Sequence, residues 1–203
     1  QIPDVTRLGK IFRAVPHSGR SRHSLRIVGT VPDTVLACSP AHAGCGTIQA
    51  GQVRDLEVTG NQEIVASAPV LVAQFTHGAM DEAVPALEAG GPGMAVVTPE
   101  EQALTATTFA VPGLAGTAGA WVNVVTPTAA LGSLTLDGTP VNPALFSAIG
   151  ASAFSGAALP VAPGAHALQG TAPFTAMVYD FGVPADHLGY GYPAAAGLAI
   201  INP

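Results

Sequence analysis

The sequence predicts an all-β protein made of two related antiparallel β-sandwich-like units with short helical turns. The first observation behind this prediction is composition: the 203 residues include 24 Gly and 18 Pro, and only 10% are charged. Such a composition is typical of many short strands joined by turns, and it excludes a helical bundle. The second observation is a strand pattern that occurs twice, which favours two copies of one β unit.

The repeated pattern is a glycine, an Ala-Pro pair that opens an apolar strand, and a closing glycine. We interpret it as an internal repeat, although β-sandwich strands share enough features to give the same order without one. The predicted units are residues 1–102, with a basic N-terminal arm and an acidic loop, and residues 103–203, with low charge. The matching residues are Gly51, Ala68-Pro69 and Gly78 in the first unit, and Gly164, Ala172-Pro173 and Gly182 in the second.

The first unit is expected to form strands where apolar and β-branched residues run between Gly and Pro. Residues 24–30 and 33–38 flank Val31-Pro32, and this spacing predicts a hairpin. Residues 77–102 lack a strand pattern, which predicts a loop or crossover with a helical turn around 81–88. The other strands are expected at residues 10–15, 47–50, 53–58, 63–67 and 70–76.

The second unit carries clear turn signals. Asn142-Pro143 predicts the cap of a short helix over Ala144 to Ile149. Phe174 to Phe181 is rich in aromatic and β-branched residues and predicts a buried core strand. The remaining expected strands are 103–111, 120–126, and the two arms of a hairpin, 133–136 and 139–141, joined by Asp137-Gly138.

Charge is unevenly distributed along the chain. Six of the seven basic residues lie in the first 26 positions, where Asp4 is the only acidic residue. The remainder of the chain holds one basic residue, Arg54, and twelve acidic residues. The commonest meaning of such a segment is a solvated basic loop. The alternative is a basic surface that contacts an acidic surface of a neighbouring subunit or an anionic glycan. The candidate assembly or anion contacts are Arg7, Lys10, Arg13, Arg20, Arg22 and Arg26.

The second unit has almost no charge, since Asp137 is the only charged residue between Gln102 and Tyr179. An exterior of this kind is expected to be uncharged and polar, or covered by another domain or subunit. A general bias of the composition toward alanine is the other explanation. No run of about 18 apolar residues occurs, so no membrane span is predicted.

Two cysteines, Cys38 and Cys45, enclose a short loop, and this spacing suits a disulfide at a hairpin tip in an oxidising compartment. Closing so short a ring would contribute roughly 2 to 3 kcal/mol. A metal site that adds His42 is the rival interpretation, although a fourth ligand is missing from the pattern. The chain begins without Met or a signal segment, and we expect it to be a mature or excised piece of a longer chain.

No catalytic constellation is present in the sequence, so an enzyme, a cofactor and a metal site are not predicted. Glu100 and Glu101 are neighbours that would point to opposite sides of a strand, and there is no G-x-S-x-G turn. His77 and His187 follow apolar segments at loop positions where a ligand site can lie. A set of four aromatic residues is either a stacking platform or partly core: Tyr179, Phe181, Tyr190 and Tyr192.

Several phrases of the sequence, taken in order, resemble the N-terminal domain family of the IgGFc-binding proteins. They extend over nearly the whole chain from about Leu8. Asp180 departs from the glycine usual in the family, Leu188-Gly189 replaces the usual serine, and HGAMDEAVPAL matches the family only loosely. The phrases are LRIVGTVPDTVLA, SAPVLVAQF, VTPEEQ, LTLDG, PGAHALQGTAPFTAMVYDFG and the closing GYGYPAAAG.

The resemblance implies a bacterial-type extracellular member of this family: a non-catalytic, β-rich module at a cell surface. Immunoglobulin binding belongs to particular animal members, and no residue carries it to this chain. We therefore expect an adhesion or surface-recognition module whose partner is a protein or glycan, with no nucleic-acid partner. The alternative is a structural subunit of a self-assembling surface filament or layer, for which a homo-oligomer is expected.

Overall fold

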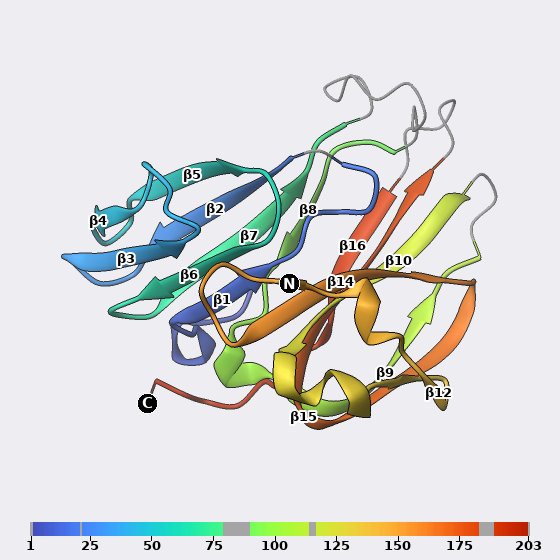
Figure 1. The fold of residues 1–203 in the computed structure, drawn as a ribbon. Helices are drawn as coiled ribbons and strands as arrows, with labels where there is room; N and C mark the ends of the chain where they lie inside the picture. Colours follow the sequence, from blue (N-terminus) through green and yellow to red (C-terminus); the bar gives the residue numbers. More distant parts are fainter. Residues whose placement is uncertain (1, 21, 79–89, 114–116, 183–188, 203) are drawn as a thin grey trace.

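The computed structural model describes residues 2–20, 22–78, 90–113, 117–182 and 189–202, and it confirms the all-β prediction. Figure 1 shows the first half of the chain on the left and the second half on the right. In the described residues the helical structure is limited to four short 3-10 turns. They are η1 (Val5–Arg7), η2 (Glu100–Gln102), η3 (Thr128–Ser133) and η4 (Pro143–Leu145).

The first half is a sandwich of two four-stranded antiparallel sheets. Side chains alternate between the shared core and the outside, and Leu25, Ile27 and Leu56 of one sheet pack with Phe12 and Ile64 of the other. One sheet has the order β1 (Ile11–Ala14), β6 (Gln62–Ala66), β3 (Thr34–Ser39), β4 (Gly46–Ile48). The other has the order β5 (Val53–Val58), β2 (His23–Gly29), β7 (Val70–Thr76), β8 (Gly93–Val96).

The predicted hairpin across Val31-Pro32 is wrong. Strand β2 pairs with β5 and β7, whereas β3 pairs with β4 and β6, so the link crosses from one sheet to the other. Leu25 and Leu36 both face the core between the sheets, and an arch is the connection that places them there. Gly29 permits the crossing, since a Cβ on it would lie 2.4 Å from the Gln49 carbonyl oxygen.

The second half is an eight-stranded antiparallel sheet built around β15 (Gly164–Gly182). Its early part, residues 164–169, pairs with β9, and residues 175–182 pair with β10. The register breaks between Gln169 and Phe174, and side chains from both parts then meet in one core. The other strands are β9 (Leu104–Val111), β10 (Thr117–Pro127), β11 (Thr135–Leu136), β12 (Thr139–Pro140), β13 (Ser147–Ala148), β14 (Phe154–Val161) and β16 (Gly189–Ala195).

Strand β15 is buried on both faces where the sequence predicts a core strand. Phe174, Ala176 and Val178 belong to the core of the second half, whereas Met177 joins the core of the first half. Tyr179 and Phe181 also point toward the first half, where they surround His17. The prediction for residues 174–181 is therefore confirmed, and this strand supports both halves at once.

Three local expectations have different outcomes. Asp137-Gly138 forms the expected turn between β11 and β12, with positive φ at both residues. The helix over Ala144 to Ile149 is wrong: Asn142 caps only the short η4, and Ser147–Ala148 pairs with β14 instead. Strand β8 was not predicted, because it lies in residues 77–102, where several glycines and prolines indicated a loop or crossover.

The turn expected around 81–88 lies outside the described residues. The internal repeat and the boundary between residues 102 and 103 stay predictions.

Candidate functional site

A groove with a volume of about 720 Å³ runs between three segments that are distant in the sequence. Its walls are the N-terminal segment, the link from β8 to η2, and the segment that follows β16. Most of the lining side chains are aliphatic, and no aromatic ring is among them. The lining residues are Ile2, Pro3, Asp4, Arg7, Val96, Val97, Thr98, Pro99, Gln102, Pro193, Ala196, Gly197 and Leu198.

The N-terminal wall is held by the 3-10 turn η1. Asp4 is its N-cap and accepts a hydrogen bond from the Thr6 amide at 3.0 Å. The hydrogen bond from the Thr6 hydroxyl and the nearby Arg7 guanidinium hold the pKa of Asp4 below its usual value. Arg7 Nη1 pairs with Asp4, and Nε donates to the Leu198 carbonyl oxygen at 3.0 Å. The arginine therefore joins the two terminal segments and is neutralised within the groove.

The C-terminal wall is held by the buried side chain of Gln102. Its Nε2 donates to the Ala199 carbonyl oxygen at 2.8 Å, and its Oε1 accepts from the Ala199 amide at 3.1 Å. The Gln102 carbonyl accepts from the Gly197 amide at 2.6 Å. A Cβ on Gly197 would lie 3.0 Å from Gln102 Oε1, so the close approach favours glycine. The groove thus has two fixed walls before any ligand arrives.

Exposed aliphatic side chains flank the groove. Ile2, Val5, Leu198 and Ile200 are each between 57% and 71% exposed. Together with the neutralised Asp4–Arg7 pair, they make an apolar surface without net charge. Such a surface is suited to contact with an apolar, uncharged segment of another molecule.

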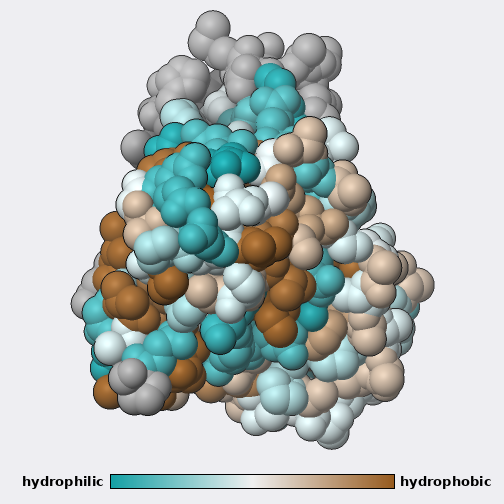
Figure 2. All heavy atoms as spheres, turned by 90° about the vertical axis from the view of Figure 1, so that its left-hand side faces the viewer, coloured by the Kyte–Doolittle hydropathy of each residue, from teal (hydrophilic) through white to brown (hydrophobic). Residues whose placement is uncertain are grey.

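Apolar side chains are also exposed on the first half of the molecule. Figure 2 shows this side, where apolar patches lie between hydrophilic ones. Val35 on β3 and Val65 on β6 are 51% and 38% exposed on the outer face of their sheet. Neither valine lines the groove described above.

The six basic residues predicted as assembly or anion contacts do not form one cluster. Only Arg7 lines the groove. Arg26 makes a double hydrogen bond with Asp55 at 2.7 and 2.8 Å, which lowers the pKa of that carboxyl group. The other placements are Lys10 exposed, Arg13 between Glu63 and Glu100, Arg20 buried over Phe181, and Arg22 beside Glu57. Their role in assembly or anion binding stays a prediction.

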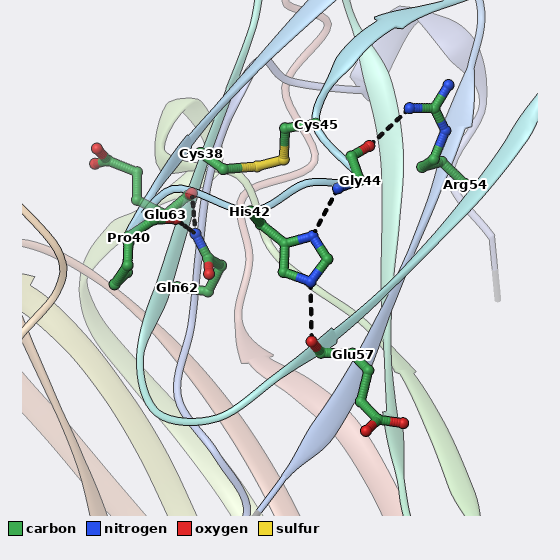
Figure 3. The surroundings of a disulfide bond; sticks show 9 residues. All are labelled: Cys38, Pro40, His42, Gly44, Cys45, Arg54, Glu57, Gln62 and Glu63. Atoms are coloured by element: carbon green, nitrogen blue, oxygen red, sulfur yellow. Dashed lines mark hydrogen bonds between the residues drawn. A yellow bond between two sulfur atoms is a disulfide. The ribbon is translucent and has the colours of Figure 1, made fainter.

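Figure 3 shows the loop closed by the Cys38–Cys45 disulfide, as the spacing predicts. His42 does not face the sulfurs as a ligand. Its Nδ1 accepts from the Gly44 amide at 3.0 Å, and its Nε2 lies 3.0 Å from the Glu57 carbonyl oxygen. Both cysteines and both ring nitrogens are therefore engaged, which removes the donors of the rival metal site. The described residues hold no group of His, Cys, Asp or Glu side chains arranged for a metal ion.

The remaining candidates are separated from the groove. His77 bonds with Ser24, and His187 lies outside the described residues. Glu100 pairs with Arg13, whereas Glu101 accepts from the Lys10 amide at 2.8 Å on the open edge of β1, so the two carboxylates serve different partners.

The four aromatic residues divide into two pairs. Tyr179 and Phe181 are core, each 2% exposed. Tyr190 and Tyr192 are partly buried and stack on one another with ring centres 6.1 Å apart. The four do not form one exposed platform.

Sequence reasoning missed the groove, because its walls come from three separate segments. Arg7 was singled out only for its charge. The side-chain role of Gln102 leaves no spacing pattern, since its partners lie almost 100 residues away.

A family model described as IgGFc binding protein matches residues 1–179. The chain belongs to this family. The match starts before Leu8 and ends at Tyr179, so the closing GYGYPAAAG phrase lies beyond it. No curated protein matches the chain.

Solved structures give only distant similarity. The apo form of Pleurotus ostreatus lectin is 10% identical with a TM-score of 0.28, covering 95% of this chain and 82% of the lectin. The same lectin in complex with GalNAc is 11% identical with a TM-score of 0.25, covering 95% and 83%. Among the described residues, no helix is long and apolar enough to cross a membrane.

Proposed function

We propose that this protein is a non-catalytic extracellular recognition module, of the adhesion type, that binds its partner in the groove between the terminal segments. The observation that carries the proposal is the groove itself. Its volume of about 720 Å³ is in the range of ligand sites, and its walls are fixed by Arg7 and Gln102. A preformed site loses little conformational entropy on binding.

The chemistry of the lining favours a protein partner over a glycan. Aliphatic side chains dominate it, and the charges of Asp4 and Arg7 cancel within the site. Such a lining matches the apolar core of a protein interface and offers little to the many hydroxyl groups of a sugar. Membership of the IgGFc-binding protein family agrees with a binding role.

The disulfide supports the extracellular part of the proposal. Disulfides persist in secreted and surface proteins and are rare in reducing compartments. The pair Cys38–Cys45 closes an exposed loop in a chain that has no other cysteine. A secreted or surface-attached bacterial-type member of the family is consistent with this chemistry.

Leu198→Asp tests the groove. This side chain is 71% exposed and lines the groove, so the variant is expected to fold and to bind at least about tenfold more weakly. Leu145→Asp is the matched control, since Leu145 is 55% exposed on η4 and does not line the groove. Binding would be measured against a panel of secreted and cell-surface proteins and against a glycan array.

Retention of a panel protein by the native chain and by Leu145→Asp, with loss in Leu198→Asp, supports the proposal. Equal binding by both variants would show that the partner contacts another surface. Retention only on the glycan array, unchanged by Leu198→Asp, would contradict a protein partner in this groove.

The second candidate function is a structural subunit of a surface filament or layer. Ile2, Val5, Leu198 and Ile200 favour it, because an uncharged apolar patch can also meet a second copy of itself. Sedimentation at high protein concentration and low salt separates the two candidates. A monomer under those conditions removes the support for a filament, whereas assembly abolished by Leu198→Asp would favour it over adhesion.

A further inference from the structure

One backbone carbonyl between the two halves accepts hydrogen bonds from both of them. The Val15 carbonyl oxygen accepts from Gln74 Nε2 of β7 at 2.8 Å and from Asn123 Nδ2 of β10 at 2.9 Å. Both amide side chains are buried, with 2% and 5% exposure. An amide from each half thus holds the same point of the link between β1 and β2.

The hydrogen bonds continue from this carbonyl into the second half. Asn123 Oδ1 accepts from the Tyr179 hydroxyl at 3.0 Å, and the same hydroxyl oxygen accepts from the Ser18 amide at 2.7 Å. Val15 and Ser18 therefore anchor both ends of a short segment to β10 and β15. Buried networks of this kind are stable only while every member keeps its partner.

The network continues into the first half through His23, whose side chain is fully buried. Gln74 Nε2 lies 2.9 Å from His23 Nδ1, and His23 Nε2 lies 3.0 Å from the Gly60 carbonyl oxygen. Because Gln74 Nε2 also donates to a carbonyl, it must be the amide nitrogen, so His23 Nδ1 must be an acceptor. The ring is held neutral with its proton on Nε2.

A proton on His23 Nδ1 would face the amide protons of Gln74. The charged ring would have to expel Gln74, and the Val15 carbonyl would lose its partner on β7. The geometry thus opposes the imidazolium independently of burial. Burial adds to the effect and lowers the pKa of His23 to about 4.

A second buried histidine lies beside the first. His17 is 3% exposed, its Nε2 lies 3.0 Å from Thr76 Oγ1, and its ring meets Tyr179 edge-on with centres 4.6 Å apart. Burial lowers the pKa of His17 to about 3, with smaller contributions from the charges of neighbouring residues. The titratable or charged groups around the two rings are Arg20 on the β1–β2 link, His77 after β7, and Tyr179 and Asp180 on β15.

We propose that this network is an acid-sensitive latch. The joint that it closes is the bridge from Gln74 of β7 through the Val15 carbonyl to Asn123 of β10, and protonation of His23 opens it by displacing Gln74 from Val15 while the sheets remain folded. His17 acts in the same direction, because its buried Nδ1 has no hydrogen-bond partner among the described residues and a charged ring would have to donate from it. The latch is separate from the proposed partner groove and does not depend on it.

The direction of the pH effect follows from linkage. Both histidines have a folded-state pKa below the unfolded value of 6.5, so the closed joint is favoured fully above pH 6.5. As the pH falls from 6.5 toward 4, the open form binds protons that the closed form excludes. The closed joint therefore loses stability progressively across this interval.

Trp121 reports on the joint because it is the only tryptophan of the chain and stacks on Tyr179, with ring centres 5.9 Å apart. Tryptophan fluorescence and far-UV circular dichroism would be recorded on the native protein from pH 7 to pH 3. The latch predicts that fluorescence changes at a higher pH than the β-sheet signal. A single transition seen equally by both probes would mean global acid unfolding and would overturn the proposal.

His23→Asn keeps an acceptor, Asn Oδ1, for the Gln74 amide and cannot be protonated. The fluorescence midpoint is expected to move to lower pH by at least about half a unit, because one excluded proton is removed. His42→Asn is the control, since this histidine lies in the disulfide loop away from the joint, and its midpoint should match the native protein. Coinciding midpoints for the native protein and His23→Asn would contradict the latch.

Nitrogen NMR of the native protein with labelled histidine keeps the proposal testable if His23→Asn does not fold. The latch requires a neutral imidazole with its proton on Nε2 at pH 7. Its protonation must occur at the pH at which Trp121 fluorescence changes. Protonation without a fluorescence change, or a proton on Nδ1 at pH 7, would overturn it.

Discussion

The two halves of the molecule stabilise their sheets in different ways. The first half places charged side chains between its strands, and Arg13 is the clearest case, with hydrogen bonds to Glu63 at 2.7 Å and Glu100 at 2.5 Å. The second half relies on apolar packing around β15, and an ionic contact joins Asp137 to His166. Low charge in the second half therefore goes with apolar packing, and Asp137, the only charged residue between Gln102 and Tyr179, has a partner in His166.

The difference follows from how much of each strand is exposed to solvent. The outward faces of the two first-half sheets carry arginine side chains that reach solvent. Arg26 is an example with 47% exposure, so its guanidinium keeps part of its hydration. Strand β15 is covered on both faces, so a charge there loses its hydration and needs a partner within the protein. Asp180 of this strand is 3% exposed and accepts a hydrogen bond from the Tyr190 amide at 3.1 Å. Val178 is fully buried, and Ala176 is 3% exposed.

Arg13→Met should give the largest effect on stability. The Arg13 side chain is 9% exposed, it pairs across β1 and β6 with Glu63, and its guanidinium lies 3.5 Å from the Phe154 ring centre. Its removal leaves Glu63 largely buried and without its partner, and we expect a loss of about 3 kcal/mol in the free energy of unfolding. Urea unfolding would measure it.

Arg26→Met is the matched control for that loss. Arg26 also pairs with a carboxylate, but both side chains are about half exposed, so water replaces the lost partner and the change should be much smaller. Equal losses of unfolding free energy in the two variants would show that burial of the Arg13 ion pair does not increase its contribution to stability.

Gln102→Ala should have an intermediate effect that stays local. The substitution removes the two hydrogen bonds between the Gln102 side chain and the Ala199 backbone. The Ala199 amide and carbonyl groups then bond to water instead. We expect a loss of about 1 to 2 kcal/mol and faster hydrogen exchange at Gly197 and Ala199. Unchanged exchange at these amides would mean that the C-terminal wall of the groove is held by other contacts.

Local sequence patterns predicted most strands because each depends on neighbouring residues. The alternation of β2 and the Asp137-Gly138 turn are decided within a few positions. The arch at Val31-Pro32 could not be predicted in the same way, because pairing partners of β2 and β3 lie in other parts of the chain. A two-residue link looks the same whether the strands pair with each other or separate into two sheets.

The groove and the joint were beyond sequence reasoning for the same physical reason. Gln102, Gln74 and Asn123 are ordinary amides in the sequence, and only the fold brings each one to a backbone group far along the chain. The cysteine spacing, in contrast, predicted the disulfide, because a seven-residue separation allows few other contacts. Short-range chemistry could be predicted from the sequence, and long-range polar contacts could not.

Asp137 and His166 should give the smallest effect, with a characteristic pH dependence. His166 Nδ1 lies 2.7 Å from Asp137 Oδ2, and Nε2 lies 2.7 Å from the Ala162 carbonyl oxygen. Both partners are acceptors, so both ring nitrogens must donate, and the imidazolium is the form that fits. Burial alone would lower the pKa of His166, but the hydrogen bonds to Asp137 and Ala162 outweigh it and raise the pKa above 6.5.

The sign of the effect is opposite to that expected at the joint. The contribution of His166 is complete below pH 6.5 and is lost as the pH rises through its folded pKa. Asp137 has a lowered pKa, chiefly through the hydrogen bond from the Ala167 amide, so its contribution is lost as the pH falls below about 4. Asp137→Asn should therefore lower the melting temperature slightly at pH 5.5 and less at pH 9, measured by circular dichroism. An equal loss at both pH values would show that the backbone bond to Ala167, rather than the imidazolium, gives Asp137 its role.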